Sequence, residues 1–343
     1  MNRKLCLALL ITISLLFIQC SKNKDTAPDV LPILYAAGSE FNGSHEVAKV
    51  WKDDVPVSLS NGMFDASANA VFVAGTDVYA AGYEYNSNNF VAAKVWKNGA
   101  STALTDGTEN GEANDVFVAG TDVYVVGNER NSRQVNIATI WKNAVPAALT
   151  DGSFYSNANS VFVSGKDVYV AGIELNSSNV SIAKLWKNGT AINLSDGNAD
   201  VSATSVFVIG TDVYVAGEET RRGRNTVAKL WKNGTATNLS DGALNTYGTS
   251  IFVAGTDVYI AGYELNNSSI AAPKLWKNGT ATTFNNGSNR GSINEVYVNG
   301  SFVYAGGSTT NINGISVATI WKNGVPTALS VIPYSEINSV FVK

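Results

Sequence analysis

Cysteine and histidine are nearly absent from this 343-residue sequence, and their scarcity excludes several kinds of site. Cys6 and Cys20 both lie in the first twenty residues, so the rest of the chain has no disulfide, no thiol nucleophile and no cysteine metal site. His45 is the single histidine, which excludes a zinc site built on several His ligands and restricts any Ser-His-Asp triad to this one position. We therefore predict no bound metal, no cofactor and no catalytic residues.

Basic charge is also scarce. The 24 Lys and Arg residues are outnumbered by 28 Asp and Glu residues, which gives a formal net charge of −4. Proteins that bind nucleic acid usually present a strongly basic face. We therefore expect no nucleic acid among the partners of this chain.

A helical period is lacking everywhere beyond the N-terminal segment. That segment has a basic start, Met1–Lys4, followed by an apolar run over residues 5–18, which is the pattern of a secretory signal and is too short to span a bilayer. Its end, Phe17-Ile18-Gln19-Cys20, resembles a lipobox. The resemblance implies that Cys20 is lipidated and becomes the mature N-terminus.

These features divide the chain into three parts. We predict a lipoprotein signal peptide at residues 1–20, a flexible tether at 21–31 and a folded domain at 32–343. The protein would then be exported and held by its lipid anchor to the membrane of a bacterial cell envelope. An ordinary export signal, cut near the same point, is the alternative.

A 45-residue repeat runs through the folded domain. One unit contains four short β-rich segments, exemplified by strand A at 250–255, strand B at 257–264, strand C at 183–189 and strand D at 235–242. Gly-Thr-Asp between A and B, and Asn-Gly between C and D, are typical of tight hairpin turns. Four strands in each repeated unit are typical of a β-propeller. Tryptophan keeps the step of 45 most strictly: Trp51, Trp96, Trp141, Trp186, Trp231, Trp276 and Trp321.

The two ends of the chain share one unit. Residues 33–38 match strand B, and strands C and D of the same unit follow at 47–52 and 56–60, whereas the last residues, 338–343, match strand A. We therefore predict an all-β fold, a seven-bladed β-propeller of four-stranded antiparallel blades. The ring closes when the C-terminal strand A joins the N-terminal strands B, C and D. An open β-solenoid, the rival fold, would need capping units at its ends.

The repeat resembles the kelch-like group of propellers. In that group, too, a strand A is followed by a strand B that ends in glycine and by an aromatic strand C. The Gly-Gly doublet of the group occurs once, at Gly306-Gly307. The resemblance covers roughly residues 31–343 and implies the blade topology, but the fold hosts many unrelated functions.

The connections between strands differ in length, which distinguishes the two rims of the predicted ring. The AB and CD turns are short and nearly identical, whereas the BC and DA loops are longer and vary. Variable loops on a rigid scaffold are the usual place for binding. Arginine, whose planar fork suits carboxylate, phosphate or sulfate, is confined to BC and DA loops outside the signal. We therefore take this BC/DA rim as the candidate surface, with Arg130, Arg133, Arg221, Arg222, Arg224 and Arg290 as ligand-binding candidates, or as solvated loop charges.

Aromatic and acidic side chains accompany the arginines on the predicted rim. Exposed rings stack on sugars or anchor a protein partner, or else pack locally against their own loops. The aromatic ligand-binding candidates are Tyr83, Tyr85, Tyr155, Tyr247 and Tyr263, with Phe64 and Phe154 nearby. A glutamate recurs at the end of strand B and would form a ring of carboxylates. This ring either binds a ligand or, together with an Asn two residues later, bonds to backbone amides of the turn. It comprises Glu84, Glu129, Glu174, Glu219 and Glu264, with Glu40 offset by one and Thr309 breaking the series.

Two further sets recur at the same step. An Asn or Thr opens strand A and is expected to face the channel mouth or to fix blades together by hydrogen bonds: Asn69, Asn114, Asn159, Thr204, Thr249 and Asn294. An Asp-Gly turn follows strand D at Asp106, Asp151, Asp196 and Asp241. A calcium loop needs several oxygen ligands at close spacing, so a single Asp favours a plain turn.

The leading functional hypothesis is a lipid-anchored binding or scaffold protein of the cell envelope, monomeric, whose BC/DA rim contacts a glycan, an anionic ligand or a protein. A carbohydrate-active enzyme on the same rim is the first alternative, either a hydrolase with paired carboxylates or a lyase that uses His45 with Tyr83 or Tyr85. A structural spacer without a ligand is the second alternative.

Overall fold

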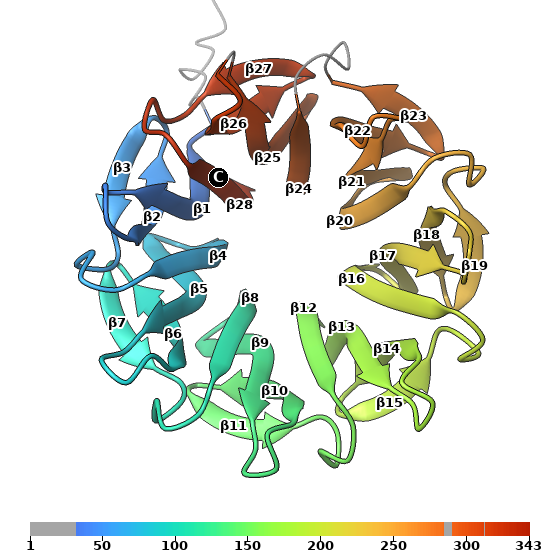
Figure 1. The fold of residues 1–343 in the computed structure, drawn as a ribbon, viewed down its shortest axis with the longest axis horizontal. Coiled ribbons are helices and arrows are strands. Elements are labelled where there is room, and N and C mark those ends of the chain that lie inside the picture. The colour runs from blue at the N-terminus through green and yellow to red at the C-terminus, as the bar shows by residue number, and fades with distance from the viewer. Residues whose placement is uncertain (1–31, 285–289, 312) are drawn as a thin grey trace, which may run out of the picture. The chain divides into compact units, whose positions relative to one another are not determined.

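The computed structural model describes residues 32–284, 290–311 and 313–343. They form seven four-stranded antiparallel sheets arranged as blades around a central axis (Figure 1). The predicted seven-bladed β-propeller is therefore confirmed. The predicted signal peptide, Cys20 and the tether lie outside the described residues. Within the described ranges, no helix has the length and apolar character needed to cross a membrane.

Each blade contains strands A to D in order from the axis outward. The A strands are β4 (Ala66–Ala74), β8 (Gly111–Ala119), β12 (Ser156–Ser164), β16 (Asp200–Ile209), β20 (Thr246–Ala254), β24 (Gly291–Asn299) and β28 (Ser335–Val342). The B strands are β1 (Leu34–Phe41), β5 (Asp77–Tyr85), β9 (Asp122–Arg130), β13 (Asp167–Leu175), β17 (Asp212–Thr220), β21 (Asp257–Leu265) and β25 (Phe302–Thr310). The C strands are β2 (Glu46–Lys52), β6 (Val91–Lys97), β10 (Asn136–Lys142), β14 (Ser181–Lys187), β18 (Thr226–Lys232), β22 (Ala271–Lys277) and β26 (Ser316–Lys322). The D strands are β3 (Val55–Ser58), β7 (Ala100–Ala103), β11 (Val145–Ala148), β15 (Thr190–Asn193), β19 (Thr235–Asn238), β23 (Thr280–Thr283) and β27 (Val325–Ala328).

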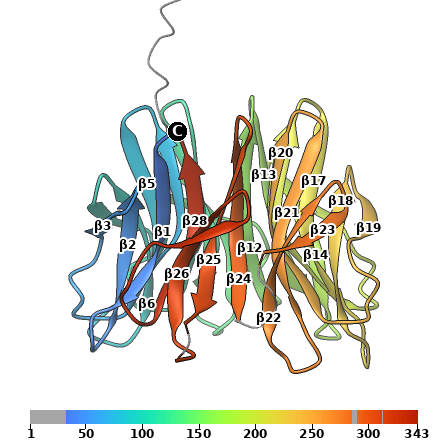
Figure 2. The same ribbon diagram turned by 90° about the horizontal axis from the view of Figure 1, so that it is seen from above.

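Blade 1 joins the two ends of the chain, as predicted. Its strand order is β28-β1-β2-β3, and the other blades follow along the chain from blade 2 (β4 to β7) to blade 7 (β24 to β27). β28 pairs antiparallel with β1, so that Leu34 lies opposite Val342, and the two strands lie side by side in Figure 2. Ile33 and Lys343 extend the pairing by exchanging two backbone hydrogen bonds of 2.8 and 3.0 Å. The exchange pairs the strand edge that β1 would otherwise expose.

The hydrophobic core consists of seven clusters, one for each interface between neighbouring blades. Strands A and B are apolar on consecutive residues because both faces of their sheets are covered by other blades. The repeated tryptophan of each blade packs against the preceding blade. Trp51, for example, contacts the cluster that contains Ile320 of blade 7 and Val340 of β28. Each of the seven indoles is at most 2% exposed, so the 45-residue step marks the blade interfaces.

A β-bulge in strand A explains a glycine in strand B. In blade 2 the register between β4 and β5 shifts between Ala68 and Ala70, which makes Asn69 the extra residue. A Cβ atom on Gly82 in β5 would lie 2.0 Å from the carbonyl oxygen of Ser67, so no larger residue fits opposite the bulge. The bulge turns the side chain of Asn69 toward the next blade, where it becomes part of a ring described below.

The AB/CD rim is held by a repeated polar network. In blade 2 the Asp77 carboxylate accepts hydrogen bonds of 2.8 Å from Lys97 Nζ and Asn98 Nδ2, and Asn98 Oδ1 accepts the Val78 amide at 2.8 Å. Asn98 has a φ of 50°, which an Asn in this hairpin turn tolerates. Blades 2 to 6 repeat the network. Because its polar groups bind one another, this rim serves the structure of the ring.

Candidate functional site

The mouth of the central channel on the BC/DA side is bounded by the predicted Asn/Thr ring. Each of its side chains donates a hydrogen bond of 2.7–3.1 Å to a backbone carbonyl of the next blade, so the prediction that the ring fixes blades together is confirmed. Asn69, for example, donates to the Ala113 carbonyl at 3.0 Å. Asn338 of β28 completes the ring and bonds to Ala68. The seven members are Asn69, Asn114, Asn159, Thr204, Thr249, Asn294 and Asn338.

A second ring lies one residue further along strand A. In four blades a serine hydroxyl accepts the amide of the next blade at 3.0–3.3 Å, as Ser250 does from Val296. In two blades a carboxyl makes this bond instead: Asp115 accepts from Val161 at 2.8 Å, and Glu295 accepts from Val340 at 2.8 Å. The seventh member is Ala70, which has no acceptor.

The two carboxyls of this second ring are half-buried at the channel. Burial is the main cause that raises the pKa of Asp115 to about 6, against which its hydrogen bonds act. Burial likewise raises the pKa of Glu295 to about 8, and the negative charge of Asp115 adds to the effect. Both groups therefore take up protons more readily than ordinary carboxyls.

Seven aromatic side chains, one from each A strand, form a third circle below these two rings and narrow the channel. We call this circle the aromatic ring. Neighbouring ring centroids are 4.8–5.1 Å apart, and their planes are inclined by 47–56°, close to a seventh of a full turn. The rings therefore stack around the axis with their edges turned inward. Sequence reasoning missed this feature, although the same 45-residue step marks it: Phe72, Phe117, Phe162, Phe207, Phe252, Tyr297 and Phe341.

The carboxylate ring at the end of strand B pairs with lysines of strand C. Glu84 binds Lys94, and the equivalent Glu–Lys pairs in blades 4, 5 and 6 are 2.5–2.9 Å apart. Glu129 has Thr139 at the lysine position, and burial followed by the charge of Asp106 raises its pKa. In blades 2, 4, 5 and 6 the predicted bonding of these Glu side chains to turn amides is thus replaced by ion pairs inside the blade. The residues are Glu84, Glu129, Glu174, Glu219 and Glu264.

The Asn two residues later does bind the turn, as predicted. Asn86 Oδ1 accepts the amides of Asn88 at 2.9 Å and Phe90 at 3.1 Å, which shapes the BC loop of blade 2. Five other blades repeat this arrangement. Blade 5 has Arg221 at this position, so its BC loop is built differently.

The candidate arginines do not converge on one site. Arg130 Nε donates to the Gln134 carbonyl at 3.1 Å, and Arg133 donates to the Gly152 carbonyl at 2.8 Å, so both are bound within the loops of blades 3 and 4. Arg290 is 3.4 Å from the Ser269 carbonyl. Arg221 and Arg222 belong to the BC loop of blade 5. Figure 1 shows that blade 4 separates this blade from blade 3.

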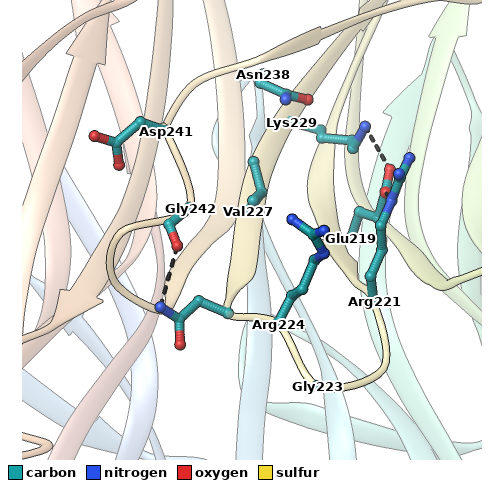
Figure 3. A pocket seen from close by; sticks show the side chains of 10 residues that line it. Glu219, Arg221, Gly223, Arg224, Val227, Lys229, Asn238, Asp241 and Gly242 are labelled. Carbon is teal, nitrogen blue, oxygen red and sulfur yellow. Dashed lines mark hydrogen bonds and ion pairs between the residues drawn. The ribbon is translucent and has the colours of Figure 1, made fainter.

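The blade 5 loop does border a cleft of about 560 Å³ (Figure 3). Glu219, Arg224 and Lys229 line it. Burial opposes ionisation of Glu219, but hydrogen bonds from Lys229 and Arg221 outweigh it and lower the pKa. Glu219 therefore neutralises part of the positive charge of Arg221 and Lys229 in this cleft, which weakens it as an anion site.

The candidate tyrosines fall into separate groups near the channel mouth. Tyr247 and Tyr263 of blade 6 lie opposite each other and stack with centroids 4.7 Å apart. Tyr83 and Tyr85 of blade 2 meet edge to face at 6.1 Å. Burial, and then the charges of nearby Glu46 and Glu112, raise the pKa of Tyr83 to about 12. Tyr155 lies in the DA loop before β12 and is 39% exposed.

A groove of about 640 Å³ opens beside the Tyr247–Tyr263 pair, between blades 6 and 7. It reaches from Asn294 at the channel mouth past Ser292 and Ser308 to Tyr334 in the loop before β28. Tyr263 and Arg290 also line it. The groove thus offers aromatic rings, hydroxyl and amide groups and one guanidinium. Sequence reasoning found Tyr263 and Arg290 but missed Tyr334, which lies in the seam that only one blade possesses.

His45 is bound within a turn. Its Nδ1 lies 3.3 Å from Asp65 Oδ1, and the same oxygen accepts the Glu46 amide at 2.8 Å. Equivalent oxygens of Asn110 and Asn245 also accept the first amide of a C strand, so Asp65 has a structural role. Among the described residues no serine hydroxyl hydrogen-bonds to the His45 ring, and no group of three or more His, Cys, Asp or Glu residues is placed to hold a metal.

Comparison with known proteins identifies the fold. Neither protein-family models nor curated protein sequences gave a match. Among solved structures the chain is similar to the acylaminoacyl peptidase of Pyrococcus horikoshii, with a TM-score of 0.56 and 12% identity over 87% of this chain and 50% of that one. It is also similar to a puromycin-hydrolysing peptidase of Mycobacterium tuberculosis, with a TM-score of 0.58 and 9% identity over 87% and 54% of the two chains. The chain thus spans about half the length of these peptidases.

A third similar structure is the β-propeller domain of the Trilobed protease from Pyrococcus furiosus. The TM-score is 0.54 and the identity 9%, over 87% of this chain and 95% of that one. That domain is described as having an open velcro topology, whereas β28 closes blade 1 here. At these identities the likeness shows the propeller fold.

The comparisons correct the functional prediction. The predicted role, that of a binding or scaffold protein, is wrong together with its carbohydrate-active and spacer alternatives, because the similar structures are peptidases and a propeller domain of a protease. The geometry supplies the physical reason for part of the correction. Four of the six arginines and four of the five carboxylates that suggested an anion or glycan site are bound to their own loops or to one another.

Proposed function

We propose that this propeller is a non-catalytic, peptide-binding module of a peptidase system and that the peptide lies in the groove between blades 6 and 7. The groove carries the proposal. Its volume of about 640 Å³ is in the range of ~300–1,000 Å³ that ligand sites occupy. The similar structures, which are two peptidases and a propeller domain of a protease, support a peptide as the occupant.

The lining of the groove suits an extended peptide. Ser292, Ser308 and Asn294 supply hydrogen-bonding groups for a peptide backbone. Tyr263 and Tyr334 supply flat apolar surfaces with polar tips for side chains. Arg290 supplies a guanidinium that can form a bidentate pair with a terminal carboxylate. The aromatic ring narrows the central channel, so in this proposal the peptide approaches from the BC/DA side.

Binding of fluorescein-labelled hexapeptides to the full chain, followed by fluorescence anisotropy, tests this proposal. We expect Tyr263→Ala to weaken binding at least tenfold, since it removes a ring from the groove. Tyr83→Ala is the matched control, because Tyr83 holds the same strand position in blade 2. Amidation of the peptide carboxyl should weaken binding to the wild type and have no effect on Arg290→Ala. Equal losses in Tyr263→Ala and Tyr83→Ala, or no saturable binding, contradict the proposal.

The non-catalytic part has its own test. The same peptides are incubated with the full chain and their cleavage is followed by mass spectrometry. We expect the peptides to remain intact, because His45 is bound within a turn. Cleavage that disappears in His45→Ala would show that the chain itself is a peptidase, whatever the groove binds.

We also propose that the chain is exported and lipidated at Cys20, that it acts as a monomer and that its partner is a peptidase of the cell envelope. The basic start, the apolar run and Phe17-Ile18-Gln19-Cys20 support export and lipidation. The glycine-ended B strand and aromatic C strand support a place in the kelch-like group. Labelling with radioactive palmitate should mark the wild type and not Cys20→Ser. An unlabelled wild type contradicts lipidation.

A further inference from the structure

A small cavity lies on the channel axis between the mouth and the aromatic ring. Its volume is about 100 Å³. It is lined by the Asn/Thr ring and by the second ring one residue further along strand A, so apart from Ala70 every lining side chain carries oxygen. We call it the axial cavity. A water needs about 10–15 Å³ of such space, so the axial cavity holds several waters or an ion with part of its shell.

The side chains of the Asn/Thr ring donate their hydrogen bonds to neighbouring protein groups and not into the axial cavity. Asn69 Nδ2 donates to both Glu112 Oε1 and the Ala113 carbonyl at 3.0 Å, which uses both of its N–H groups. Asn114, Asn294 and Asn338 likewise make two bonds each. Thr204 and Thr249 give their hydroxyl protons to carbonyls. Asn159 donates one such bond and keeps one N–H group. Apart from that N–H, the side-chain groups of the Asn/Thr ring that remain for the axial cavity are acceptor oxygens.

Asp115 and Glu295 add negative charge to these acceptors. Serine makes the same bond to the next blade in four blades, so the bond does not require a carboxyl. A half-buried carboxylate without a positive partner keeps part of the cost of its desolvation. No Lys, Arg or His is among the residues that line the axial cavity, all of which are described. The two carboxyls thus lack a protein cation on this side of the aromatic ring.

We propose that the axial cavity binds a hydrated divalent cation of the calcium class. Carboxylates, Asn amide oxygens and waters are the ligands that Ca²⁺ takes, with six to eight oxygens in a flexible shell. Seven blades hold the oxygens on a wide, fixed ring, which suits this larger ion better than the tight octahedron of Mg²⁺. The cation neutralises Asp115 and Glu295 and, by bonding to oxygens of all parts of the ring, stabilises the closed propeller.

Glu112 and Glu336, which face the same Asn ring from the mouth, add attraction for a cation.

Calorimetric titration of the full chain with CaCl₂ tests the proposal, after removal of metal with EDTA and dialysis. We expect one ion per chain, a higher thermal midpoint with CaCl₂, and weaker binding of MgCl₂ and KCl. Glu295→Gln should lose at least tenfold in affinity. Glu336→Gln is the matched control, because it removes the same charge at the mouth, outside the residues that line the axial cavity.

Three outcomes overturn the proposal. They are no saturable binding of CaCl₂ to the wild type, equal affinity of wild type and Glu295→Gln, and an equal loss in Glu295→Gln and Glu336→Gln. If Glu295→Gln does not fold, Glu295→Ser replaces it, because four blades fold with serine at this position. Peptide binding is measured separately, so failure here leaves the groove between blades 6 and 7 untouched.

Discussion

The Glu295 carboxyl links the stability of the propeller to pH in a direction opposite to that of most carboxyls. Burial is the main cause that raises its pKa from 4.5 to about 8, and the charge of Asp115 contributes. The folded protein therefore keeps a proton that the unfolded chain loses above pH 4.5. The stabilisation is fully present below pH 4.5 and is lost as the pH rises through about 8.

The size of the effect follows from the two pKa values. Each pKa unit is worth about 1.36 kcal/mol, so the rise from 4.5 to about 8 corresponds to about 5 kcal/mol of stability lost across this range. Glutamine is neutral and nearly isosteric with glutamic acid, and its amide oxygen can accept the Val340 amide as the carboxyl does at 2.8 Å. Glu295→Gln should therefore match the wild type near pH 5 and exceed it by up to about 5 kcal/mol at pH 9.

Unfolding in guanidinium chloride at pH 5, 7 and 9, in the presence of EDTA, measures this difference. Glu336→Gln is the control and should follow the wild type, because its carboxylate is exposed and accepts a hydrogen bond from Asn294 at 2.8 Å. Parallel pH profiles for wild type and Glu295→Gln would refute the reasoning, since they would mean that Glu295 is ionised in the folded protein at neutral pH.

Three further variants test the ring itself. Deletion of residues 338–343 removes most of β28, so we expect a lower thermal midpoint and aggregation on size-exclusion chromatography; an unchanged midpoint would contradict closure by β28. Gly127→Ala places a Cβ 1.9 Å from a carbonyl oxygen and should lower the thermal midpoint strongly. Gly120→Ala is the control, because it meets no atom and costs only about 1–2 kcal/mol for its positive φ. Equal losses in the two variants would contradict the bulge. Asn159→Ala leaves the Ala203 carbonyl without its 2.8 Å bond and should cost about 1–3 kcal/mol in chemical unfolding, whereas no loss would mean that the ring bond is dispensable.

The architecture could be predicted because its signals are periodic and local. Trp96 and its equivalents pack between blades, and each must therefore recur once per blade. Asn98 with its positive φ, and the Asp77–Lys97 pair, fix the turns from within a few residues. The entry of the chain at strand B and its end at strand A then specified both the blade count and the closure.

The candidate site was harder to predict because it depends on contacts between residues far apart in the sequence. The Glu84–Lys94 pair joins two strands whose relative register the sequence does not state, so the carboxylate ring was open to a functional interpretation. The bulge at Asn69 adds one residue that ordinary strand alternation does not anticipate. The repeat did contain the aromatic ring and the Ser/Asp/Glu ring, but their closure around an axis emerges only when seven copies are placed side by side.

Comparison between the copies also locates the proposed peptide groove and leads to a last prediction. Ser292 and Ser308 of blade 7 lie opposite each other, and in blade 6 the same two positions carry the stacked pair Tyr247 and Tyr263. The groove of about 640 Å³ is thus present where two small side chains replace two large ones. The double variant Ser292→Tyr, Ser308→Tyr copies the blade 6 pair into blade 7. It should fold, because blade 6 accommodates the same pair on the same backbone, and it should fill the groove and abolish peptide binding in the anisotropy assay. Retained binding with an unchanged thermal midpoint would mean that the peptide site lies elsewhere on the rim.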